Sequence, residues 1–239
     1  MRNHFEPHPV LYLASRSPRR VELLKQIGIN FEMLLLRCDP RRGVDVDETP
    51  LDGEAAEPYV RRICLEKARV GSESLRLRNL PSFPVLAADT TVALGEDLLG
   101  KPADPAEARR ILERLRGRTH TVLTALALVR APDPTLESEL CVSPVRMRAY
   151  SDDEIEAYIR SGDPFDKAGG YAIQNLTFHP VADFYGCAAS VMGLPLCHLA
   201  RLLLRCGITP PADIPTACQA HLDYTCTIFA AVLRGEEAG

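Results

Sequence analysis

The chain has 239 residues, of which 46% are hydrophobic and 25% charged, enough for one large domain or two small ones with a substantial core. Its formal net charge of −4 excludes a general basic field for nucleic acid, so any anion site must be built locally. No apolar run could span a bilayer and residues 1–10 lack a signal-type apolar stretch, so we expect a soluble, cytoplasmic protein. Eight cysteines, mostly within apolar patterns, are typical of reduced core residues.

The first informative stretch is 11–28, an apolar strand that runs directly into a helix. Ser17 is a favourable N-cap and the proline after it a favourable first residue, which places Arg19 and Arg20 in the first turn. Cations there face the positive end of the helix dipole, so stability alone does not explain them. A phosphate at this turn would accept hydrogen bonds from the free N–H groups, both guanidinium groups and the Ser15 and Ser17 hydroxyls. Two solvated surface arginines are the alternative.

Hydrophobic periodicity and capping residues predict the remaining elements, which mix helices and strands as an α/β fold does. The expected strands are 29–36, 85–94, 98–102, 119–129, 140–149 and 181–185, with 119–129 and 140–149 antiparallel. The expected helices are 58–70, 105–117, 152–162, 193–205 and 216–233. A long exposed loop is expected over 38–57 and an irregular segment over 163–174, because both are rich in turn-forming residues.

Asp89 is the single charge inside the apolar run VLAADTTVAL, residues 85–94. A carboxylate within a buried strand is costly unless it is paired or binds a cation. The return strand over 98–102 would bring Lys101 back beside this run, and Lys67 lies at the edge of a buried helical stripe. Desolvation therefore makes Asp89 the best catalytic candidate. A structural aspartate that accepts backbone N–H bonds is the alternative.

Seven segments carry recognisable motifs in a fixed order: LASRSPRR with ELL, VDE, EKA, ADT, GKP, FDKAGGYAIQ and VMGLPL, between residues 13 and 196. Their order and spacing resemble the Maf-like nucleoside triphosphate pyrophosphatases. The resemblance implies a Maf/ITPase-like α/β fold, in which a mixed twisted sheet has flanking helices and a deep substrate cleft lies between two lobes. We therefore expect a pyrophosphatase domain over residues 1–207 and a C-terminal helical extension over 208–239.

The resemblance implies hydrolysis of a nucleoside triphosphate to the monophosphate and pyrophosphate, by water attack at the α-phosphate with a divalent cation, Mg²⁺ or Mn²⁺. Asp89 matches the general base or metal-binding carboxylate, and Glu48 matches a second acid that faces the metal. The matched substrate-binding residues are Ser15, Ser17, Arg19, Arg20, Lys67, Lys101 and Lys167. For Lys67 and Lys101 the alternative is an aliphatic stem that packs on an apolar surface while its ammonium stays in water.

Three positions follow base preference within the family, and here they read Arg19, Thr90 and Gln174. This combination resembles the branch that acts on dTTP and UTP, and a glutamine amide can both donate to and accept from a pyrimidine edge. One rival is a pyrophosphatase for a modified purine triphosphate such as 7-methyl-GTP. Another is a nucleotide-binding regulator of septation, because the family is associated with arrest of cell division. The implied partner is the triphosphate, with no nucleic acid and no membrane, and a homodimer is left open.

Two regions depart from the family pattern. The loop 38–45 is longer and more basic, with Arg41 and Arg42, and residues 186–188 read Gly-Cys-Ala instead of Gly-Ser-Tyr. The tail beyond residue 207 holds Cys218, His221 and Cys226, which could form part of a zinc site. One helix cannot readily supply all three ligands, because the two cysteines are roughly two turns apart. Small core residues on an apolar helix face are the stronger interpretation.

Overall fold

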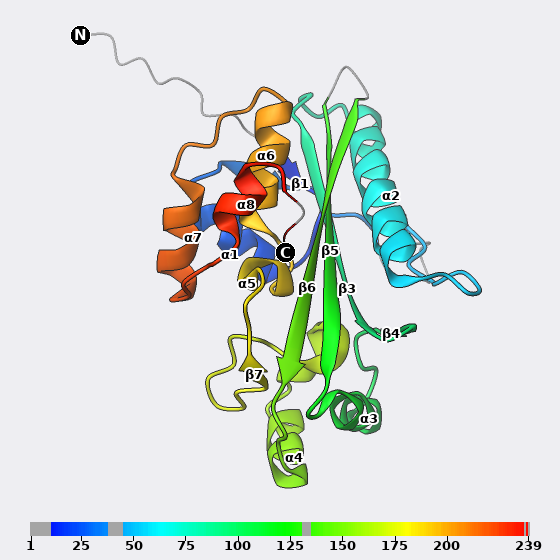
Figure 1. The fold of residues 1–239 in the computed structure, drawn as a ribbon. Helices are drawn as coiled ribbons and strands as arrows, with labels where there is room; N and C mark the ends of the chain where they lie inside the picture. Colours follow the sequence, from blue (N-terminus) through cyan, green and yellow to red (C-terminus); the bar gives the residue numbers. More distant parts are fainter. Residues whose placement is uncertain (1–10, 38–44, 131–134, 237, 239) are drawn as a thin grey trace.

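The structure is a computed structural model that describes residues 11–37, 45–130, 135–236 and 238. Within these ranges seven strands form one mixed sheet of order β2-β1-β3-β5-β6-β7, with β4 paired to β3 (Figure 1). β1 is parallel to β2 and β3, and the other pairs are antiparallel. The strands are β1 (Leu11–Leu13), β2 (Phe31–Met33), β3 (Val85–Leu94), β4 (Asp97–Leu99), β5 (Thr119–Val129), β6 (Leu136–Met147) and β7 (Val181–Asp183).

Helices flank this sheet on both faces, which confirms the predicted α/β class. They are α1 (Pro18–Gln26), α2 (Ala56–Leu77), α3 (Pro105–Leu115), α4 (Asp152–Arg160), α5 (Ala188–Val191), α6 (Leu196–Arg205), α7 (Ile214–Leu222) and α8 (Phe229–Leu233). α2 covers one face, α6 and α8 lie over the other, and α3 and α4 lie at the far end of the long strands (Figure 1). α2 packs closely because Gly71 faces β3, where an added Cβ would lie 2.9 Å from a Val85 methyl.

Several predicted boundaries are confirmed by local chemistry. Ser17 is the N-cap of α1 and Gly28 follows its end at φ 70°. The capping box of α4 is present, with the Ser151 hydroxyl accepting from the Glu154 backbone and the Glu154 carboxylate accepting from the Ser151 backbone. The segment expected to be irregular forms short 3-10 turns at Asp163–Asp166 and Ala168–Gly170.

Other boundaries were predicted wrongly, mostly where one residue ends a pattern. The helix expected over 216–233 is two helices, because Asp223 takes a left-handed conformation at φ 48° and ends α7. α6 begins at Leu196 and not at Gly193, whose φ of 103° is not helical. The helix expected over 58–70 runs from Ala56 to Leu77, and the strand expected over 29–36 is only Phe31–Met33.

Some expectations fall on residues that the structure does not describe: those for 1–10, for Arg41 and Arg42, and for part of the turn before β6. No helix in the described ranges has the length and apolar character that a membrane crossing requires. The proposed division at residue 207 stays a prediction, but α7 and α8 contribute Ile214 and Val232 to the same buried cluster as α1 and α6.

One edge of β3 has two different neighbours, and this arrangement positions the site. β1 pairs with β3 at Val85 and Leu86, whereas β4 pairs with it from Val92 onward. On the other edge β5 pairs with β3 from Val85 to Ala93. Residues 87–91 therefore lie where β1 has already turned away into α1 and β4 has not yet begun.

Candidate functional site

A cleft with a volume of about 690 Å³ lies beside residues 87–91 of β3. Its walls are the start of α1, the loop around Glu48, α2, and the segments 166–174 and 191–193. Every residue that the sequence predicts for the site lines it: Ser15, Ser17, Arg19, Arg20, Glu48, Lys67, Asp89, Thr90, Lys101, Lys167 and Gln174.

The described lining of the cleft is basic although the whole chain is acidic. Seven basic side chains line it (Arg16, Arg19, Arg20, Arg37, Lys67, Lys101 and Lys167) against four acidic ones (Asp47, Glu48, Asp89 and Asp166). This excess of three positive charges contrasts with the net charge of −4 for the chain. A local field of this sign favours an anion such as a phosphate chain.

The acidic part of the cleft is built around the Lys67 ammonium. Its Nζ lies 2.7 Å from Asp89 Oδ1 and 2.7 Å from Glu48 Oε1. Lys67 faces the sheet because α2 buries Ile63 and Cys64, which precede it by four and three residues. Asp89 is only 8% exposed. Its ion pair with Lys67 therefore provides the partner that a charged side chain within an apolar strand needs.

Burial and charge act in opposite directions on these three groups. Burial raises the pKa of Asp89, and the Lys67 and Arg20 cations offset only part of that rise. Burial raises the pKa of Glu48 as well, but the charge and hydrogen bond of Lys67 together with the Lys101 and Arg20 charges outweigh it, so the net pKa is lowered. For Lys67 burial lowers the pKa, but Asp89 and Glu48 more than reverse this effect, so the pKa is raised. Lys67 and Glu48 are therefore held firmly in their charged forms.

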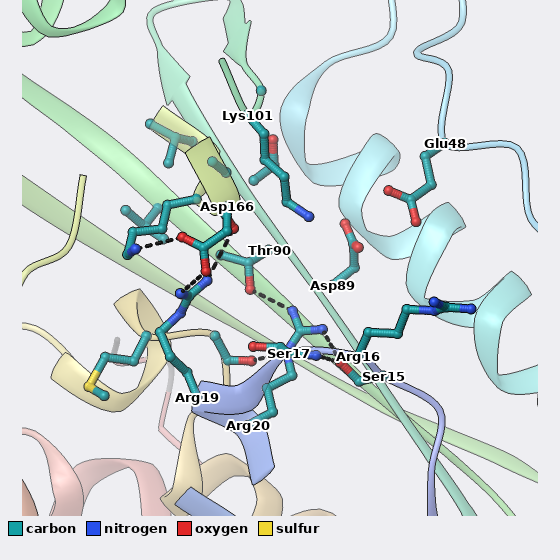
Figure 2. Close-up of a pocket in the computed structure, with 18 of the residues that line it drawn as sticks. Ser15, Arg16, Ser17, Arg19, Arg20, Glu48, Asp89, Thr90, Lys101 and Asp166 are labelled. Atoms are coloured by element: carbon teal, nitrogen blue, oxygen red, sulfur yellow. Dashed lines mark hydrogen bonds and ion pairs between the residues drawn. The ribbon is translucent and has the colours of Figure 1, made fainter. Parts of the chain in front are cut away.

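Two carboxylates that converge on one point of positive charge fit a hard divalent cation. Mg²⁺ and Mn²⁺ prefer carboxylate oxygens, and Mg²⁺ usually binds through one or two carboxylates together with substrate phosphates. In Figure 2 Glu48, Asp89 and the tip of Lys101 surround the same part of the cleft. Glu48 and Asp89 are thus the residues that could hold such an ion.

The loop that carries Glu48 is tied to the first turns of α2. The Tyr59 hydroxyl donates to the Glu48 carbonyl at 3.0 Å. Arg62 donates to the Thr49 carbonyl at 3.1 Å and to both carboxylate oxygens of Glu54, at 2.7 and 2.6 Å. These contacts fix the backbone of an exposed loop beside Lys67, and the sequence motifs gave no sign of them.

On the other side of the strand Arg20 is held by fixed acceptors. Its Nε donates to the Gly193 carbonyl at 2.7 Å, and its terminal nitrogens donate to Ser15 Oγ and Thr90 Oγ1, both at 3.1 Å. Thr90 Oγ1 lies 3.0 Å from Thr124 Oγ1. One N–H remains on each terminal nitrogen for a ligand. Burial lowers the pKa of Arg20, with Asp89 opposing that shift.

Gly193 permits this close approach. Its φ of 103° is a conformation that side chains disfavour, and an added Cβ would lie 3.3 Å from both Arg20 Nε and Thr90 Oγ1.

The start of α1 has backbone N–H groups that are open to a ligand. Ser17 makes no side-chain cap bond, its own N–H donates to Ser15 Oγ at 3.2 Å, and the first turn of α1 holds no acidic residue.

Asp166 joins the two remaining basic residues. Arg19 donates to Asp166 Oδ2 at 2.8 Å (Figure 2), and Lys167 donates to Asp166 Oδ1 at 2.6 Å. Lys167 also donates to the carbonyl and the carboxylate of Asp163, at 2.6 and 2.8 Å. The three N–H groups of Lys167 are therefore already used. Asp166 lies within the predicted FDKAGGYAIQ motif, but no role for it could be read from the sequence.

Lys101 and Gln174 lie at the rim of the cleft and are exposed. Neither makes an ion pair or a side-chain hydrogen bond to another residue in the described ranges, so both are free to meet a ligand.

The C-terminal tail does not form a zinc site from Cys218, His221 and Cys226. In the described ranges no three His, Cys, Asp or Glu side chains gather as a structural zinc site requires. His221 Nε2 instead lies 3.5 Å from Oε1 of Glu22 in α1.

The chain is similar to known proteins over most of its length. A family model described as Maf-like protein matches residues 10–206. The chain is 48% identical over 203 residues to a dTTP/UTP pyrophosphatase of Ralstonia nicotianae, covering 85% of this chain and 97% of the relative. It is 48% identical over 194 residues to one of Aromatoleum aromaticum (81% and 93%), and 46% over 200 residues to one of Dechloromonas aromatica (84% and 98%). The chain belongs to the Maf-like protein family.

Proposed function

We propose that the chain hydrolyses nucleoside triphosphates, dTTP and UTP in preference to others, to the monophosphate and pyrophosphate. The observation that carries this proposal is a buried carboxylate, Asp89, inside a cleft whose described lining has more basic than acidic side chains. A protein that only bound the nucleotide would gain nothing from a carboxylate that repels phosphate. The names of relatives that are 46–48% identical over most of the chain support the same reaction.

The reaction needs in-line attack of water on the α-phosphorus and neutralisation of the charge on the phosphate oxygens. We assign Asp89 to accept the proton of the attacking water, because burial already raises its pKa toward that of a base. Arg20 and Lys101 bind phosphate oxygens through their remaining N–H groups, with the Ser15 and Ser17 segment at the helix start. A divalent cation held by Glu48 and Asp89 would polarise phosphate oxygens and stabilise negative charge that develops there.

We assign base choice to the end of the cleft that Gln174 lines. Gln174 is exposed and lines the cleft next to Ile173, and Val191 and Met192 belong to the same lining. Apolar side chains of this kind can pack against a nucleobase, and the amide of Gln174 can both donate to and accept from a pyrimidine edge. Arg19, fixed by Asp166, is assigned to the same end.

The test is pyrophosphate release with Mg²⁺ from dTTP, UTP, dGTP and 7-methyl-GTP. We expect release to be fastest from dTTP and UTP, and Asp89→Asn to lower it by at least about a hundredfold, as loss of a general base does. Asp97→Asn, which changes an exposed carboxylate on β4 outside the cleft, is the matched control and should keep full activity. Release that is fastest from 7-methyl-GTP would favour the modified-purine rival, and none from any nucleotide would favour a binding protein.

A further inference from the structure

The Lys67 ammonium lies where a metal ion would need to bind. It contacts one oxygen of Glu48 and one of Asp89, each at 2.7 Å. A divalent cation bound to the same two carboxylates would lie within about 2.0–2.6 Å of their oxygens. An ammonium and a dication cannot share these oxygens at such distances without strong repulsion.

The surrounding charges disfavour a free metal ion further. The described lining has three more basic than acidic side chains, so a dication that enters alone moves against the local field. A nucleoside triphosphate carries about four negative charges at neutral pH and keeps about two after it binds Mg²⁺, so the metal–nucleotide complex is attracted by the same field. Its phosphate oxygens also give an ammonium a new partner.

We propose that Lys67 acts as the resident cation of the free protein and excludes a lone divalent ion. Its ammonium moves away from Glu48 and Asp89, and onto phosphate oxygens, only when a triphosphate brings the metal. This inference rests on the proposed function for the identity of the incoming complex. It assigns Lys67 a second role besides phosphate binding, namely to fix the order in which metal and nucleotide enter. Lys67 also offsets the repulsion between the two acids in a substrate-free cleft, where the Glu48 charge contributes to the raised pKa of Asp89.

The inference is tested by titrating Mn²⁺ into the full chain without nucleotide and following the free-ion signal by electron paramagnetic resonance. Lys67→Gln removes the resident cation and should bind Mn²⁺ at least about tenfold more tightly than the wild type. Lys67→Arg keeps a cation at this position and should bind weakly. Lys101→Gln is the matched control, because it removes one charge from the same cleft but no contact with either acid, and it should change the affinity less than about threefold.

Three results would overturn the inference: equal Mn²⁺ affinity in the wild type and Lys67→Gln, tight binding by Lys67→Arg, or an equal gain in Lys101→Gln. Circular dichroism melting checks that each variant is folded, and Lys67→Met replaces Lys67→Gln if the latter is not. The titration contains no nucleotide, so its result does not depend on pyrophosphate release. A tight-binding Lys67→Gln beside an inactive wild type would refute the proposed function alone, and an active wild type with equal affinities would refute this inference alone.

Discussion

Replacing Thr90 with valine tests how the two faces of β3 contribute to the site. The sequence predicts that Thr90 influences base choice, whereas the geometry turns its hydroxyl toward the Arg20 guanidinium at 3.1 Å and toward Thr124 at 3.0 Å. Valine keeps the shape but cannot accept a hydrogen bond. We therefore expect Thr90→Val to loosen Arg20 and to slow hydrolysis of every nucleotide alike.

The expected magnitude follows from the bond that is lost. A hydrogen bond to a charged group contributes about 1.5–3 kcal/mol. The lower end applies here, because Arg20 also donates to Gly193 and Ser15 and partly faces the cleft. A loss of about 1.5 kcal/mol in the transition state corresponds to a roughly tenfold lower kcat/KM.

The assay measures kcat/KM for dTTP, UTP, dGTP and 7-methyl-GTP in the wild type, Thr90→Val and Thr90→Ser. Serine keeps the hydroxyl and should retain most of the activity. The reasoning is refuted if Thr90→Val changes the ranking of the nucleotides, because Thr90 would then contact the base. An unchanged rate on all four nucleotides would mean that the bond to Arg20 does not matter for turnover.

Three further predictions address other parts of the molecule. Gln174→Glu should lower kcat/KM for dTTP and UTP by at least about tenfold, the scale of one mismatched base contact, and unchanged rates in the nucleotide panel would exclude that contact. Tyr59→Phe removes the hydroxyl bonded to the Glu48 carbonyl and should raise the Mg²⁺ concentration needed for half-maximal rate by about threefold to tenfold while kcat at saturating Mg²⁺ changes little, which a merely destabilised protein would not show. His120 has a pKa lowered from 6.5 to about 4 by burial, so the unfolded state binds its proton first as the pH falls. The contribution of neutral His120 to the free energy of unfolding is complete above about pH 6.5 and decreases toward pH 4. About 2 kcal/mol of it is lost at pH 5. Urea unfolding at pH 7.5 and 5 should show a smaller acid loss in His120→Gln, and an equal loss would contradict this assignment.

The parts of the site that the sequence predicts depend on local pattern. Asp89 stands out because its neighbours in the chain form an apolar strand, and Lys67 because the helical period places it beside the buried stripe. The first turn of α1 stands out because its charges oppose the helix dipole. In each case a residue conflicts with the element around it, and the conflict can be read from fewer than about ten consecutive residues.

The contacts that resolve these conflicts join distant segments and could not be predicted. Arg20 reaches Gly193, 173 residues away, and Arg19 reaches Asp166, 147 residues away. The hydrogen bond from the Tyr59 hydroxyl to the Glu48 carbonyl depends on the path of an exposed loop, whose sequence has no periodic pattern. The break between α7 and α8 has a similar origin, because a left-handed aspartate at 223 has no distinct signature in an otherwise helical pattern.

The alternation of β3 explains why the site has two chemically different walls. Successive side chains of a strand point to opposite faces, so Asp89 meets Lys67 of α2 while Thr90 meets Arg20 and Thr124 on the other face. Both walls reach the cleft because β1 and β4 leave this part of the β3 edge uncovered. A triphosphate that enters there meets carboxylates suited to a metal on one side and fixed N–H donors on the other. A register shift of one residue in β3 would exchange the two walls, so the full pairing with β5 along the opposite edge is also what keeps acid and guanidinium on their proper sides.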